Sequence, residues 1–157
     1  MSRLARRHRR GQSLVEFALV FPIFMLVVFG IIDVGRYVYV VNAFSQAARE
    51  GARYGSVEQW QYGCPGTVVT QNRLTCTQQV VKDRMAAAPA IYTVTATCTT
   101  DGIKSASAAS CRAHDLLKVV VQTPSSPANQ TFTLFTPIVG NLIGPIVISA
   151  QAQVVVQ

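Results

Sequence analysis

The chain has 157 residues, of which 50% are hydrophobic and only 13% are charged. This length fits one ordinary domain, and a half-apolar composition excludes an intrinsically disordered protein. Charged residues make up about a quarter of a typical soluble domain. The chain is therefore too apolar for a plain soluble domain, and one segment must carry the excess.

The positive charge of the chain is concentrated at its beginning. The formal net charge is +7, but five of the fourteen Lys and Arg residues lie within the first ten positions. Without residues 1–11, nine basic and seven acidic side chains remain, so the charge falls to +2. A nucleic-acid-binding face needs Lys and Arg spread along a folded surface. We therefore expect no nucleic-acid partner.

An unbroken apolar run follows the arginines. It covers residues 17–32, and counting from Leu14 gives nineteen residues with a single charge, on Glu16. A helix rises about 1.5 Å per residue and needs about 20 such residues to cross a hydrocarbon core of about 30 Å. The run predicts one membrane crossing. The positive-inside rule predicts that the arginines stay in the cytoplasm and that everything after about Asp33 lies outside.

Three simpler interpretations of this run compete with a processed membrane anchor. A buried soluble helix would be apolar on every side, and a chain of this length cannot easily enclose it. A cleaved secretory signal has an apolar stretch of about 7–15 residues, and the nearest small-residue cleavage site, at 41–43, is too far downstream. A single-pass anchor that is never processed remains open.

The junction between the arginines and the apolar run carries a distinctive pattern. It reads Arg9-Arg10-Gly11-Gln12-Ser13-Leu14-Val15-Glu16-Phe17, so a glutamate lies five residues past a glycine that ends a basic leader. This pattern resembles the class III signal of type IV pilins. Residues 11–22 and the later run 47–53 resemble the TadE-like minor pilins of tight-adherence (Tad/Flp) pilus systems more closely. The resemblance covers about residues 11–55.

The resemblance implies a processed structural subunit. An integral-membrane prepilin peptidase would cut between Gly11 and Gln12, and a glycine lets a protease approach the backbone closely. The cut would leave the apolar helix attached. The resemblance also implies that Glu16 meets the N-terminal amine of a neighbouring subunit, whereas the simpler alternative is a glutamate that reaches the lipid headgroups. Pro22, the second residue assigned to assembly, removes one helical hydrogen bond and predicts a kink.

The helical pattern continues beyond the membrane to about residue 56. Asp33 and Arg36 share a helix face, and we interpret them as an ordinary interfacial ion pair of little energetic weight. Further along, small residues recur every four positions, namely Ala43, Ala47, Gly51 and Gly55. Such a stripe lets another element approach closely, either the protein's own sheet or the same helix of a neighbour. A helix over 12–56 would extend about 65 Å, so its lower part should protrude as a stalk.

The remaining hundred residues predict a small mixed domain. Their alternation and turn signals predict a turn at 63–66, a helix at 76–88 stopped by Pro89, strands at 91–98, 115–123 and 146–156, a turn at 124–127, and a short helix within 134–143. We expect an antiparallel sheet packed on the outer half of the first helix. The predicted fold class is α+β and pilin-like.

Four cysteines lie on the outer side of the predicted membrane segment: Cys64, Cys76, Cys98 and Cys111. An even number in an oxidising compartment predicts two disulfides. Of the three possible connectivities we favour Cys64–Cys76 with Cys98–Cys111, since each pair closes a short loop between neighbouring elements. Zinc-binding pairs are usually two to four residues apart. The gaps here are eleven, twenty-one and twelve residues, so we expect no metal.

No catalytic motif is present in the sequence. The histidines are His8, in the leader, and His114, which with Asp115 reads as a surface pair at the start of a strand. No phosphate loop, nucleophile elbow or metal-binding run appears. We expect no enzymatic activity and no cofactor.

The predicted organisation has three parts: a basic leader at 1–11, a transmembrane and assembly helix at 12–41, and an extracytoplasmic domain at 42–157. The first hypothesis is a minor pilin or pseudopilin of a Tad/Flp pilus, processed after Gly11. Its partners would be the prepilin peptidase, other pilin or Tad subunits and membrane lipid. Its location would be the cytoplasmic membrane and, after processing, an extracellular adhesive pilus. The alternative is an uncleaved, membrane-anchored accessory or binding protein with a disulfide-stabilised outer domain.

Overall fold

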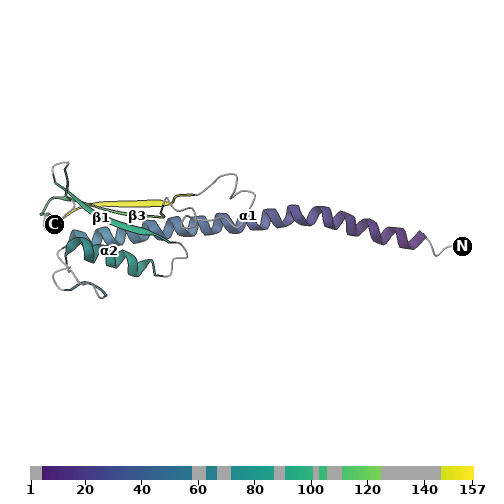
Figure 1. The fold of residues 1–157 in the computed structure, drawn as a ribbon, viewed down its shortest axis with the longest axis horizontal. Coiled ribbons are helices and arrows are strands. Elements are labelled where there is room, and N and C mark those ends of the chain that lie inside the picture. The colour runs from purple at the N-terminus through teal and green to yellow at the C-terminus, as the bar shows by residue number, and fades with distance from the viewer. Residues whose placement is uncertain are drawn as a thin grey trace.

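The structure is a computed structural model that describes residues 5–57, 63–66, 72–86, 91–100, 103–105, 111–124 and 146–157. Within these residues the elements are, in chain order, α1 (Ala5–Ser56), α2 (Arg73–Arg84), β1 (Thr93–Thr100), β2 (Ile103–Ser105), β3 (Leu116–Gln122) and β4 (Ser149–Val155). The strands form one antiparallel sheet in the order β2-β1-β3-β4. Sheet and α2 both lie against the C-terminal half of α1, whose N-terminal half projects alone (Figure 1). The predicted α+β fold class is confirmed.

Helix α1 is the longest element of the molecule. Its 52 residues extend about 78 Å at 1.5 Å per residue. It ends at the predicted residue but begins at Ala5, because arginine is a good helix former and adding a turn to an existing helix avoids the cost of nucleation. Pro22 lies inside the helix without ending it, and Figure 1 shows only a gentle curve in this half.

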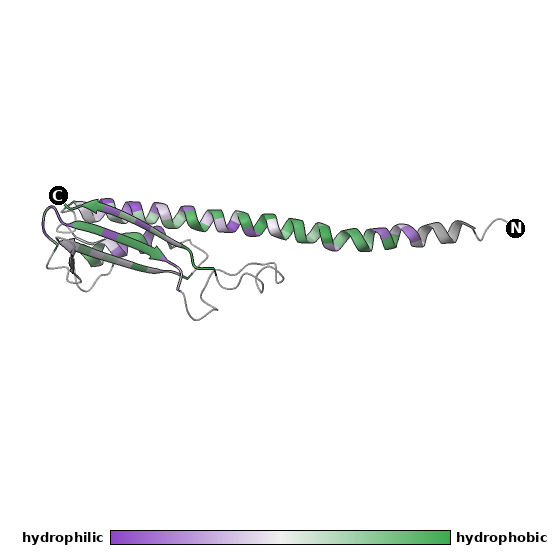
Figure 2. Ribbon diagram, turned by 90° about the horizontal axis from the view of Figure 1, so that it is seen from above, coloured by the Kyte–Doolittle hydropathy of each residue, from purple (hydrophilic) through white to green (hydrophobic). Residues whose placement is uncertain are grey.

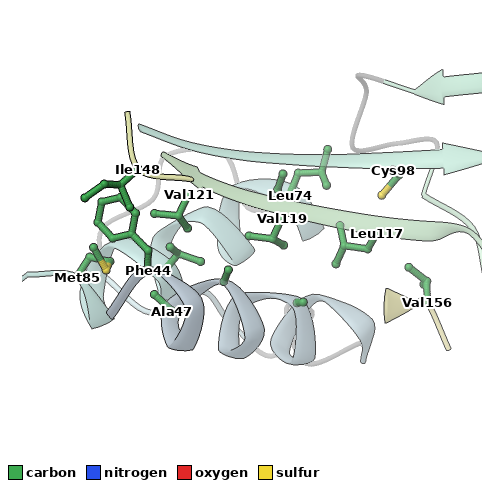
Figure 3. Packing of buried hydrophobic residues seen from close by; sticks show 14 of the residues in the cluster. Phe44, Ala47, Leu74, Met85, Cys98, Leu117, Val119, Val121, Ile148 and Val156 are labelled. Carbon is green, nitrogen blue, oxygen red and sulfur yellow. The ribbon is translucent and has the colours of Figure 1, made fainter. Parts of the chain in front are cut away.

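The core lies between the C-terminal half of α1, α2 and one face of the sheet. Phe44 of α1 is fully buried and meets Met85 and Ile148 at one end of this core (Figure 3). Leu117, Val119 and Val121 of β3 are also fully buried. Their alternation with half-buried or exposed neighbours is the pattern that predicted this strand.

The predicted strands are found with shifted ends, and one strand was missed. Strand β1 runs two residues further than 91–98, while β3 and β4 are shorter than predicted. β4 begins at Ser149 because Ile148 donates its backbone N–H to the side chain of Thr123 instead of to a backbone carbonyl. The three-residue β2 pairs with the end of β1. Such a short strand has no alternation long enough to recognise.

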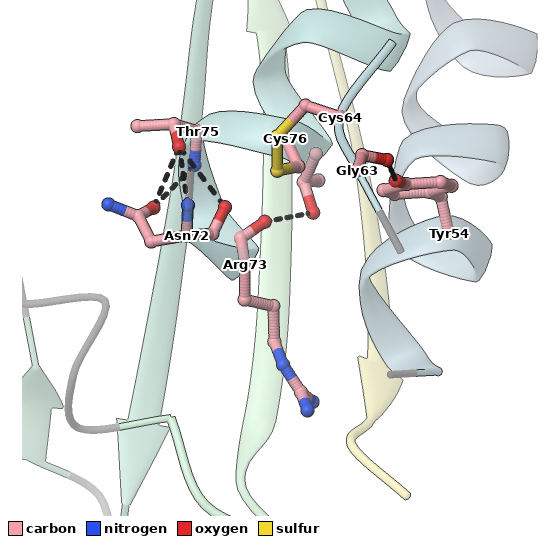
Figure 4. The surroundings of a disulfide bond; sticks show 8 residues. Tyr54, Gly63, Cys64, Asn72, Arg73, Thr75 and Cys76 are labelled. Carbon is pink, nitrogen blue, oxygen red and sulfur yellow. Dashed lines mark hydrogen bonds between the residues drawn. A yellow bond between two sulfur atoms is a disulfide. The ribbon is translucent and has the colours of Figure 1, made fainter. Parts of the chain in front are cut away.

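Helix α2 begins three residues before its predicted start because of its N-terminal cap. The Asn72 side chain accepts a hydrogen bond from the Thr75 N–H at 2.8 Å, and the Thr75 hydroxyl accepts one from the Asn72 N–H at 3.1 Å (Figure 4). This reciprocal capping box satisfies two backbone donors at the helix end. The helix ends at Arg84. Pro89, most of the predicted turn at 124–127 and the predicted helix at 134–143 lie outside the described residues.

The structure pairs the four cysteines as Cys64–Cys76 and Cys98–Cys111, with Cα–Cα distances of 5.0 and 5.6 Å. The first bridge ties the turn at 63–66 to the first turn of α2 (Figure 4). The second ties β1 to the segment before β3. Closing a loop of about a dozen residues contributes about 3 kcal/mol in the chain-entropy model. The bridges thus support a domain whose core is small.

The small-residue stripe of α1 packs within the protein's own domain. A Cβ atom at Gly51 would overlap Val81 of α2, and one at Gly55 would overlap both Leu117 of β3 and Thr77 of α2. Ala47 is buried as well. The sequence left two partners open for this stripe, the protein's own sheet and the same helix of a neighbouring subunit. In the structure the stripe packs against the protein's own sheet and α2.

Gly55→Ala should therefore destabilise the domain. Overpacking costs about 1–3 kcal/mol, although alanine recovers up to about 1 kcal/mol in helix propensity. We expect faster hydrogen–deuterium exchange of the β3 amides in the detergent-solubilised chain. Gly35→Ala is the matched control, because a Cβ there meets no atom within 4 Å. Equal exchange in the two variants would contradict this close packing.

Candidate functional site

The N-terminal half of α1 exposes large apolar side chains on all sides. From Leu14 to Tyr39 they include Val15, Phe17, Leu19, Val20, Phe21, Ile23, Phe24, Leu26, Val27, Phe29, Ile31, Ile32, Val34, Tyr37 and Val38. The most apolar 18-residue window has a mean hydropathy of 2.6, and the protein buries none of it. Figure 2 shows this apolar stretch on the projecting part of the helix. By length and composition it can cross a membrane.

Burial of α1 side chains begins at the C-terminal end of this apolar stretch. Val40 and Phe44 are almost completely buried and join the core. Asp33 is already 4% exposed, while Ile32 and Val34 beside it are exposed. Its carboxylate lies 4.0 Å from the Arg36 guanidinium. The sequence predicted this pair but not the burial of the Asp33 carboxylate.

The predicted processing site lies inside α1. Gly11 and Gln12 are both exposed, and a Cβ placed on Gly11 would meet no atom within 4 Å. A glycine inside a helix costs about 1 kcal/mol relative to alanine. The bond that a peptidase would cut is therefore accessible, and it lies at a weak point of the helix.

Glu16 and Pro22 both lie on the exposed half of α1. Glu16 accepts a 3.5 Å hydrogen bond from the side-chain amide of Gln12, one helical turn away. The structure thus brings together Gly11, Gln12 and Glu16 within about two turns. The four cysteines belong to the domain at the other end of α1.

The expected surface pair His114-Asp115 is wrong for Asp115. His114 is exposed and has a φ of 73°, whereas Asp115 is buried. The Asp115 carboxylate accepts a 2.6 Å hydrogen bond from the backbone N–H of Arg112. This bond lowers the pKa of Asp115, against the opposing effect of burial; Thr100 and the charges of Arg112 and Arg73 lower it further. Asp115 therefore closes a turn with the backbone of Arg112.

Arg73 is a buried residue that the sequence did not single out. Its guanidinium donates to the backbone carbonyl of Gly55 at 3.4 Å, in the last turn of α1. The neighbouring carbonyl of Ser56 accepts from the Gln157 N–H at 2.9 Å. These bonds satisfy acceptors that a helix end leaves without partners. A single arginine eighteen residues away gives no sequence signal for this role.

Two open hollows lie along α1 and α2, with volumes of about 330 and 300 Å³. Glu50 borders both and forms an ion pair with Arg84. Neither hollow is lined by a cysteine, serine or histidine. Within the described ranges, no three His, Cys, Asp or Glu residues gather where they could hold a metal ion. The outstanding feature of the molecule is therefore the exposed apolar helix.

Comparison with known families agrees with this view. Residues 11–53 match the model of the TadE-like proteins. The resemblance to this family is thereby confirmed. No curated protein and no solved structure matches the chain. The TadE-like region begins at the candidate processing glycine and ends within the part of α1 that carries the domain.

The TadE-like match implies a protein associated with a Tad pilus. It also indicates interaction with other subunits of such a pilus and anchoring in a membrane through the apolar helix. The matched region contains Gly11, Gln12, Glu16 and Pro22. The disulfide-bonded sheet lies outside it.

The lowered pKa of Asp115 predicts a pH-dependent contribution to stability. The usual pKa of an unfolded aspartate is about 3.9. Because the folded pKa lies lower, the contribution is complete above about pH 4 to 5 and is lost as the pH falls through the folded pKa. Between pH 7 and pH 3, the urea midpoint of the wild-type domain should fall more than that of Asp115→Asn. Equal falls would show that Asp115 gains nothing from its ionised state.

Proposed function

We propose that this chain is a minor pilin or pseudopilin-type structural subunit of a Tad/Flp pilus. A prepilin peptidase cuts it between Gly11 and Gln12, and it assembles through its apolar helix. One observation carries this proposal. The C-terminal half of α1 is packed within a folded domain, whereas the N-terminal half is apolar and is not covered by the rest of the protein. The TadE-like match over residues 11–53 supports it.

The uncovered half-helix suits both a membrane and an assembly. Apolar side chains gain little from leaving lipid for another apolar helix, so packing and polar contacts decide whether membrane helices associate. Glu16 carries the single charge among residues 14–32, and its carboxylate is expensive to bury without a partner. The new α-amino group created at Gln12 would supply a positive charge for a neighbouring subunit's Glu16.

The disulfides support an orientation with the domain outside the cytoplasm. Structural disulfides persist in oxidising compartments and are rare in the cytoplasm. The arginine cluster supports the same orientation, because basic residues next to a membrane helix stay inside. We infer a subunit anchored in the cytoplasmic membrane, with its N-terminus inside, that enters an extracellular adhesive pilus after processing. Its role is structural, with no catalytic residue and no cofactor.

The N-terminus of the protein in its native membrane tests the processing step. Intact-mass and N-terminal peptide mass spectrometry should find a chain that starts at Gln12. Gly11→Leu should retain residues 1–11, because a branched side chain obstructs the approach of the peptidase to the backbone. Ser13→Ala, two residues away, is the matched control and should be cut normally.

Two other results would contradict the proposal in different ways. A wild-type chain that still carries its arginines would favour the uncleaved anchored protein. A chain that starts near Phe44 would show an ordinary secreted domain without its anchor.

Glu16→Ala should insert normally but assemble several-fold less well, because the half-helix loses the charge that we assign to a neighbouring subunit. The measurement is the ratio of the variant in sheared filaments to that in the membrane fraction. Glu16→Gln is the informative control, since it keeps the size and hydrogen-bonding capacity of the side chain and removes only its charge. A normal amount of Glu16→Gln in filaments would rule out an ionic partner.

A further inference from the structure

The residue that the proposed cut would expose is a glutamine. Gln12 follows Gly11 directly, and both residues are exposed. In the uncut chain the Gln12 nitrogen belongs to the peptide bond with Gly11, and an amide nitrogen is a poor nucleophile. The cut would free this nitrogen as an α-amine, within reach of the side-chain amide of the same residue.

The surroundings of Gln12 leave the amine and the amide free to meet. The N-terminal part of α1 projects away from the sheet and from α2 (Figure 1), and a Cβ placed on Gly11 would meet no atom within 4 Å. After the cut the helix would begin at Gln12, and the first N–H groups of a helix have no acceptor within it. No helical hydrogen bond would therefore hold the new amine.

The side-chain amide of Gln12 is held only weakly. Its Nε2 donates to the Glu16 carboxylate at 3.5 Å, between two exposed side chains one turn apart. Ordinary N–H···O hydrogen bonds are about 2.9–3.0 Å long. A contact this long on an open helix surface does not prevent the amide from folding back toward the amine.

The charge state of the new amine depends on whether Glu16 approaches it. The pKa of an ordinary α-amino group is about 7.7–8.0, so roughly a tenth to a sixth of it is neutral at pH 7. The positive end of the helix dipole favours the neutral form. An exposed Glu16 carboxylate is screened by solvent and opposes this effect little. Between packed helices the same carboxylate would keep the amine protonated.

We propose that Gln12 is a modification site, at which a processed but unassembled chain closes a pyrrolidone ring. The neutral α-amine attacks the carbonyl carbon of the Gln12 side-chain amide. A bond between them forms, the bond from that carbon to Nε2 breaks, and ammonia leaves with a proton from the amine. Both reacting groups belong to one residue, so the reaction has the advantage of proximity and needs no oxidant or cofactor.

Ring closure at Gln12 competes with assembly. The nitrogen of the ring is an amide and carries no positive charge, so a neighbouring subunit's Glu16 would lose its ionic partner. In an assembled chain that Glu16 holds the amine in its protonated form, which cannot attack. The ring therefore marks chains that stay in the membrane. This inference rests on the proposed function, because an uncut chain has no amine at Gln12.

The N-terminal peptide from membranes and from sheared filaments tests this competition. Primary amines are tagged with an amine-reactive reagent before digestion and mass spectrometry. A ring-closed peptide carries no tag and lacks one ammonia, and its fraction should be several-fold higher in membranes than in filaments. An isotope-labelled peptide of the same N-terminal sequence, added at lysis, measures closure during the preparation.

Gln12→Met is the matched control. Methionine is unbranched and similar in length to glutamine, but its side chain has no carbonyl carbon for the amine to attack. The variant should therefore keep a tagged N-terminal amine in both fractions.

The possible failures differ in the same spectra. If the chain starts at Gln12 and its amine is tagged in both fractions, the ring does not form and the inference is overturned, whereas the cut after Gly11 stands. Equal ring-closed fractions in membranes and filaments would overturn the competition with assembly. If the chain starts at another residue, the proposed processing fails, and the inference fails with it.

Discussion

One helix in this protein must satisfy two environments along its length. Its C-terminal half needs a face of small residues, because Val81, Leu117 and Thr77 come so close that no side chain fits at Gly51 or Gly55. Its N-terminal half needs apolar side chains on every side, because the rest of the protein buries none of its most apolar part. A continuous helix joins the two halves without a loop, so the orientation of the anchor and that of the domain are fixed together.

The rest of the fold follows from this constraint. The buried face of the sheet packs against α1, and α2 covers another side of the same helix. The domain core is small, and small cores often need covalent support. The two disulfides supply it by tying α2 and β1 to neighbouring turns. Arg73 and Gln157 close the end of α1 with hydrogen bonds, which anchors the last turn of the support.

Much of this fold could be predicted from the sequence, because local patterns encode it. The apolar run at 17–32 predicted the projecting helix, and the alternation of Leu117, Val119 and Val121 predicted β3. What the sequence left open depends on contacts between distant segments. The stripe at Gly51 and Gly55 fits either a sheet or a neighbouring helix until the sheet is seen. Asp115 looked like a surface residue because its hydrogen bond to the Arg112 backbone forms only when the turn folds.

The projecting half of α1 carries two carboxylates, Glu16 and Asp33, and the fold treats them differently. Each would be costly within a membrane without a partner, up to about 3 kcal/mol at its centre. Asp33 is covered by its own chain and lies beside Arg36. Glu16 is exposed, and its only hydrogen bond within the described residues is the 3.5 Å contact from the Gln12 amide. The fold thus satisfies the carboxylate nearest the domain, and it leaves the one nearest the processing site free to accept a stronger donor from outside the chain.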